Sequence, residues 1–234
     1  MIEKWWVFPF IAILGISLLA FIPSPSNTLN PNKYIDSYEN IFIKASTIDL
    51  YFDDTSDKIF LNDKLFVEEK KDAVYLTAPS QFSISSQSTK IVIGTKNRIQ
   101  KLRVDGISIK ISGIAAITSI IIDGIGINID SDISCESIDM KGTGITVKGL
   151  MDCTTAKING TSVNLNIAMA NNKDMDINCT SINATIKYFE DSPYFKDLRV
   201  SGLSGAMSLI LPKNDFFKVE KNISKNIAVN TFFY

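Results

Sequence analysis

The feature that most constrains this chain is a sequence repeat with a period of 18, which runs between positions 82 and 173. Glycine recurs with this period, with aliphatic residues at fixed distances before and after it, at Gly106, Gly124, Gly142 and Gly160. A strand of alternating aliphatic residues has one apolar face, which a single turn of chain cannot bury. Stacking the turns about 4.8 Å apart superimposes like side chains and closes a continuous core. The repeat therefore predicts a parallel β-solenoid.

The aliphatic positions of the repeat form four columns. Two columns precede the glycine and begin at Leu102 and Val104, and Ile84 extends the first of them one coil earlier. Two more columns follow the glycine and begin at Ile91 and Ile93. Because Asp or Asn precedes three of the four glycines, we expect tight bends there, with glycine at a positive φ. The outward columns mix Lys, Asn and Thr and carry no stripe of one charge.

Two of the three cysteines, Cys135 and Cys153, are separated by one period of the same repeat. The repeat places them on neighbouring coils, where they form either a small buried ladder or, outside the cytoplasm, a disulfide. Both remain open, because the stacking distance lies within the Cα–Cα range of disulfides. Cys179 has no partner in register, and we expect it to be buried.

Residues 5–22 contain no charged side chain, and as a helix they would nearly span a bilayer core of roughly 30 Å. Trp5 and Trp6 stand where an interfacial aromatic belt lies. We expect an uncleaved single-pass anchor in the cell membrane. The alternatives are a cleaved signal peptide, whose apolar core is usually shorter, and a buried core helix, which would need a polar face. Lys4 before the span favours an extracytoplasmic C-terminal domain.

The rest of the chain divides into a linker, antiparallel strands that cap the first coil, the coils themselves and a C-terminal cap, at residues 23–39, 40–81, 82–205 and 206–234. Capping strands are expected because an uncovered first coil would expose unpaired backbone groups. Toward the end of the coils the period loosens. There, Ile177 and Val200 continue the Val104 column, at offsets that lengthen to 19 and then 23.

Composition argues against several classes of function. The 234 residues have a formal net charge of −1, so there is no basic excess for nucleic acid. The absence of histidine removes the usual catalytic triads and the commonest metal ligand. A polysaccharide-active enzyme would need charged residues clustered on one outward face, and the nearest such group is Asp123, Asp139, Lys141 and Lys157. We interpret these four as turn and surface residues, and we predict no enzyme activity, no cofactor and no metal.

Four short motifs occur in an order that resembles the putative adhesin family of bacterial envelope proteins. A first strand at residues 43–50 and a second at residues 72–76 precede the coils, and residues 209–212 lead into residues 217–219 after them. The resemblance covers the chain from about Asn40 onward. It implies a β-solenoid with a frequent N-terminal membrane anchor, and it implies no catalytic residue.

These features favour a membrane-anchored, extracytoplasmic β-solenoid that acts as a non-catalytic scaffold or adhesin-like binding module of the cell envelope. Its partner would be an envelope protein or a glycan. One alternative is an accessory protein of envelope-stress regulation, although only three residues precede Lys4. A polysaccharide-active enzyme is the less favoured alternative.

Overall fold

The computed structural model describes residues 28–79, 88–189, 196–213 and 218–234. Every regular element in these residues is a β-strand, which confirms the all-β prediction for the described chain. The strands are β1 Thr28–Leu29, β2 Lys33–Asp36, β3 Asn40–Asp53, β4 Lys58–Leu61, β5 Phe66–Lys70, β6 Ala73–Thr77, β7 Ser88–Gly94, β8 Ile99–Met169, β9 Asp174–Tyr188, β10 Lys196–Ser201, β11 Ser204–Leu211, β12 Val219–Ile223 and β13 Ile227–Phe233.

Two of the sequence predictions fall outside the described residues. The membrane anchor at residues 5–22 is one, and the placement of Ile84 is the other. In the ranges that the structure does describe, no helix has the length and apolar character needed to cross a membrane.

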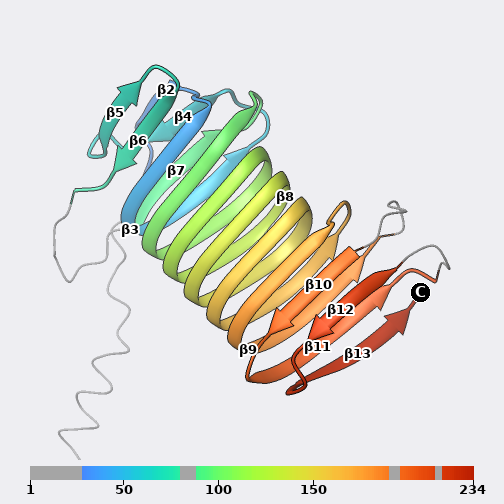
Figure 1. Cartoon of the computed structure of the whole chain (residues 1–234). Coiled ribbons are helices and arrows are strands. Elements are labelled where there is room, and N and C mark those ends of the chain that lie inside the picture. The colour runs from blue at the N-terminus through green and yellow to red at the C-terminus, as the bar shows by residue number, and fades with distance from the viewer. Residues whose placement is uncertain (1–27, 80–87, 190–195, 214–217) are drawn as a thin grey trace, which may run out of the picture.

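The 71 residues of β8 wind in successive turns that stack along one axis (Figure 1). Side-chain hydrogen bonds between residues one period apart join one turn to the next. Ser131 Oγ donates to the carbonyl of Gly113 at 2.6 Å, and Ser137 Oγ donates to Ser119 Oγ at 3.1 Å. Strand β9 then pairs in parallel with the last turn of β8. We call β3 together with β7 to β13 the coil stack.

Inward columns of aliphatic side chains form the core of the coil stack. The first column after the glycines is at most 2% exposed, at Ile109, Ile127, Ile145, Val163 and Ile182. Each such side chain contributes about 1.5–3 kcal/mol on burial, so the columns are the main source of stability. The parallel registers also pair Ile158 with Ile177 and Ile177 with Val200, which confirms the predicted continuation of the Val104 column.

One extra residue enters the repeat between the last turn of β8 and β9, where the register offset becomes 19. Asn172 lies at this insertion and is fully buried. Its Nδ2 donates to the carbonyl oxygens of Cys153 and Asp174, both at 3.1 Å. Because buried backbone acceptors need partners, this side chain compensates for the local break in the ladder.

The expectation of antiparallel capping strands is wrong for β3. This strand pairs in parallel with β8 on one side and with β6 and β7 on the other. The reason is its side-chain spacing, because Ile41 and Ile43 align with Leu102 and Val104 of the first β8 turn. Strand β3 therefore forms part of the first coil.

The position of β3 also corrects the placement of Ile91. The sequence pattern stacks Ile91 directly below Ile109, whereas in the structure Ile91 pairs with Leu50, and Leu50 pairs with Ile111. Strand β3 thus lies between β7 and β8. An aliphatic period alone cannot reveal a strand that enters the stack from an earlier part of the sequence.

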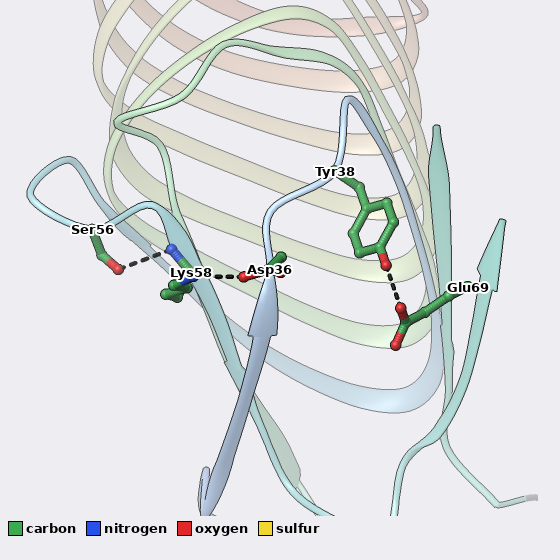
Figure 2. A network of polar contacts seen from close by, with 5 residues as sticks. All are labelled: Asp36, Tyr38, Ser56, Lys58 and Glu69. Carbon is green, nitrogen blue, oxygen red and sulfur yellow. Dashed lines mark hydrogen bonds and ion pairs between the residues drawn. The ribbon is translucent and has the colours of Figure 1, made fainter. Parts of the chain in front are cut away.

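The antiparallel pairs are β2 with β4, β4 with β7, and β5 with β6, and they lie at the N-terminal end of the stack. Figure 2 shows the polar contacts that tie them together. Lys58 Nζ lies 2.5 Å from Asp36 Oδ1, and the Lys58 backbone N–H donates to Ser56 Oγ at 3.1 Å. On the other side, the Tyr38 hydroxyl donates to the Glu69 carboxylate. This second contact joins the segment before β3 to the β5–β6 hairpin.

We expect the β5–β6 hairpin to loosen at high pH. The hydrogen bond to Glu69, followed by burial, raises the pKa of Tyr38 to about 12. Because the folded-state pKa lies above the unfolded value of about 10, this contact stabilises the protein fully below pH 10 and is lost as the pH rises toward 12. Hydrogen exchange of residues 66–77 should therefore accelerate between pH 10 and pH 12, beyond the intrinsic rise. In Tyr38→Phe that extra step should be absent, and an unchanged step would contradict the assignment.

The C-terminal strands, at residues where the sequence predicted a cap, continue the parallel pairing. Strand β12 pairs in parallel with β10, and β13 pairs in parallel with β11. Two inward positions of this last coil are polar. Lys221 pairs in register with the inward Leu198, and Thr231 pairs in register with the inward Leu209. Lys221 Nζ donates to Thr231 Oγ1 at 3.1 Å. Inward-pointing polar groups of this kind discourage further strand pairing.

Candidate functional site

A groove of about 490 Å³ lies on the outer surface of the coil stack, on the side formed by the first strand segment of each coil. We call it the polar groove. Residues two apart on a strand point to the same side, so the outward positions of this segment form parallel columns. The central column runs Ile121, Asp139, Lys157, Asp176 and Arg199, and the registers pair Lys157 with Asp176 and Asp176 with Arg199.

A second column brings hydroxyl groups to the same groove, from Ser119, Ser137 and Thr155. It continues into Asp174, which pairs in register with Thr155. Hydroxyl groups both donate and accept hydrogen bonds, whereas carboxylates only accept and ammonium groups only donate. The two columns therefore offer every type of polar contact over several successive coils.

Charged groups of the polar groove are only partly neutralised by one another. Arg199 forms an ion pair with Asp197 at 3.6 Å, and Asp139 contacts Lys141 at 3.9 Å. In contrast, Lys157, Asp174 and Asp176 form no ion pair with another residue of the described ranges.

The other oxygen of Asp139, Oδ1, is enclosed and has no hydrogen-bond partner among the described residues. An enclosed carboxylate oxygen without a partner loses its hydration without compensation.

The structure brings together only part of the charged cluster noted in the sequence. Asp139 and Lys157 line the groove, while Asp123 and Lys141 belong to the adjacent outward column. Sequence reasoning missed Asp174, Asp176 and Arg199 because they follow the point where the period loosens. Extending the outward columns by the same lengthened offsets as the Val104 column would have found them. Over the described part of the chain, no group of three or more His, Cys, Asp and Glu residues is arranged to hold a metal ion.

The four repeat glycines meet only part of the expectation made for them. None of them has a positive φ, which instead occurs at Gly113, Gly149 and Gly205. A Cβ atom on Gly142 would lie 2.6 Å from the carbonyl oxygen of Gly124, and a Cβ on Gly124 would lie 2.9 Å from that of Gly106. Glycine is thus required by the close approach of one coil to the next.

The structure joins Cys135 and Cys153 by a disulfide between neighbouring turns, with their Cα atoms 4.5 Å apart. Cys153 is fully buried, and Cys135 is partly buried beside a second surface hollow that Arg98 and Glu136 also line. Cys179 is buried, as predicted, and its burial raises the pKa of its thiol.

No family model matches the chain, and no curated protein matches it either. Among solved structures, the chain is similar to a putative adhesin from Bacteroides fragilis NCTC 9343. The identity is 14%, the match covers 88% of this chain and 99% of that one, and the TM-score is 0.47. It is also similar to a putative lipid binding protein from Parabacteroides distasonis ATCC 8503. There the identity is 17%, the coverage is 88% and 97%, and the TM-score is 0.43.

Proposed function

We propose that this protein is a parallel β-solenoid held at the cell membrane by residues 5–22, with its coils outside the cytoplasm, and that it acts there as a non-catalytic binding module of the cell envelope. The hydrogen bonds and the disulfide between residues one period apart support the solenoid. The uncharged run of residues 5–22 supports the anchor.

The polar groove carries the binding role. It contains charges of both signs, at Lys157, Asp174 and Asp176, that form no ion pair within the described residues, and a column of hydroxyl groups lies beside them. These groups project from a stack whose inward columns are closely buried, so their spacing is held rigidly before a ligand arrives. Preorganisation of this kind lowers the entropy lost on binding. The groove therefore suits an extended polar ligand that contacts several coils at once.

The arrangement also supports a non-catalytic role. Catalysis requires a nucleophile, acid or base to be focused on one reacting atom. Here the polar groups repeat along the coil axis, and Lys157 separates Asp139 from Asp176 in their shared column. Such a column suits binding over a length of ligand better than reaction at one point.

Photocrosslinking in intact cells tests this proposal on the full chain. A photoreactive residue at Thr155, in the groove, should yield crosslinked species that the same residue at Ser134 does not. Ser134 is the matched control, because it is exposed on another side of the coil. The double exchange Lys157→Asp with Asp176→Lys keeps the net charge and should remove the Thr155 adducts. Equal adducts at both positions, or adducts that survive the exchange, would refute the groove as the binding site.

The anchor is tested separately by fractionation and by protease added outside spheroplasts. The full chain should sediment with membranes and be digested from outside, and a chain lacking residues 5–22 should lose its membrane association. Recovery of the full chain in the cytosol would refute the proposed location.

A further inference from the structure

A second outward side of the coil stack becomes free of charge toward its C-terminal end. We call this region the uncharged face, and it consists of Asn164, Asn166, Asn183, Thr185, Ser208 and Asn230. The registers place these residues side by side on four neighbouring strands, since Asn164 pairs with Asn183, Asn166 with Thr185, Thr185 with Ser208, and Ser208 with Asn230.

The lack of charge is local. In the earlier coils the same outward positions include Lys110, Asp130 and Lys148, and no Asp, Glu, Lys or Arg occupies them after Lys148. A surface with about 25–35% charged residues is the proportion recommended for keeping a designed protein soluble, and this region has none. Lys187 borders the uncharged face, but its ammonium group lies over the rings of Phe189 and Tyr234, 5.3 and 4.8 Å from their centroids.

The polar side chains of the uncharged face are free of hydrogen bonds to other described side chains and backbone groups. None of the six makes a side-chain hydrogen bond to another residue in the described ranges. Their amides and hydroxyls both donate and accept, so a ligand could use each of them in either sense. They project from one parallel sheet, whose strands lie about 4.8 Å apart, and therefore form a flat and regular array.

An exposed aromatic ring borders the same face. Phe232 lies two residues after Asn230 on β13, so the two side chains point outward together. Phe232 pairs in register with Ile210 on the neighbouring strand. Its side chain is nevertheless 54% exposed. An outward ring beside amides and hydroxyls combines an apolar contact surface with neutral hydrogen-bonding groups.

We propose that the uncharged face binds a neutral polysaccharide. Sugar hydroxyls match the amide and hydroxyl groups in donor and acceptor capacity, and the C–H face of a sugar ring packs on an aromatic ring. A charged polymer or lipid headgroup would lose hydration here without gaining an opposite charge, which disfavours it. This site lies on a different side from the polar groove, and it goes beyond the proposed function without depending on it.

The test is affinity electrophoresis of the full chain in detergent micelles through gels that contain dextran, mannan or laminarin, with polygalacturonate as the acidic comparison. At least one neutral polymer should retard the protein, and polygalacturonate should not. Asn183→Lys should weaken retardation at least tenfold, and Phe232→Ala should weaken it as well. Asn128→Lys is the matched control, because Asn128 occupies the same column three coils before Asn183, among charged neighbours, and it should bind like the unchanged chain.

Retardation by none of the neutral polymers overturns the proposal. It is also overturned if polygalacturonate binds equally well, or if Asn128→Lys weakens binding as much as Asn183→Lys. The exchange of Lys157 and Asp176 separates the two sites, since it should leave retardation unchanged while it removes the crosslinks at Thr155. Circular dichroism of each variant establishes that the strands are intact.

Discussion

Replacing Gly142 with valine should lower the free energy of unfolding by about 3 kcal/mol, the upper end of ordinary overpacking costs. A Cβ atom at this position would lie 2.6 Å from the carbonyl oxygen of Gly124 and 3.1 Å from Ile127 Cδ1. The nearest atom belongs to the backbone, so relief requires one coil to move away from the next. Urea unfolding of the full chain, followed by the circular dichroism of its strands, measures the loss.

Gly144→Val is the matched control, because the two glycines lie two residues apart in β8 and neither has a positive φ. No atom lies within 4 Å of a Cβ at Gly144. Valine favours strands, and replacing glycine reduces the entropy of the unfolded chain, so this variant should be neutral or slightly more stable. If both valine variants destabilised the protein equally, close coil contact would not be the reason for the glycine repeat.

Reduction of the bond between Cys135 and Cys153 should also cost about 3 kcal/mol of unfolding free energy. The bond closes a loop between cysteines at a sequence separation of 18, and closing a loop of that size restricts the unfolded chain by about this amount. Urea unfolding with and without a thiol reductant gives the difference directly. The double variant Cys135→Ala with Cys153→Ala should match the reduced protein and should not respond to the reductant.

Cys179→Ala provides the comparison for this experiment. Cys179 is buried and is not part of the disulfide, so its replacement costs packing energy but should leave the full response to reductant. The expected contribution would be contradicted if the protein begins with the disulfide formed and its unfolding free energy does not fall when the reductant is added.

Much of the coil stack could be predicted from the sequence because each coil must supply an aliphatic residue at the same inward positions. Ile109, Ile127 and Ile145 illustrate this, since they follow one another at the period of the repeat and each is at most 2% exposed. The requirement is local to each coil and repeats along the chain. Even the coils after the period lengthens could be followed, through Ile177 and Val200.

The candidate sites were less accessible from the sequence. Outward positions carry no packing requirement, so the charges of Asp174, Asp176 and Arg199 follow no repeated pattern that would identify a groove. The uncharged face was also missed. Its Asn, Thr and Ser residues suggest only a solvated surface until the registers place six of them on adjacent strands.

The all-β class, the coil period and the inward columns could be predicted from the residues alone, because they depend on the alternation of side chains within each coil. What lies between the coils became known from the three-dimensional structure. It placed β3 between β7 and β8, moved the positive φ angles from the repeat glycines to Gly113, Gly149 and Gly205, and joined Cys135 to Cys153. Each of these features depends on which strands become neighbours and on the distance between them. Packing between successive coils sets both.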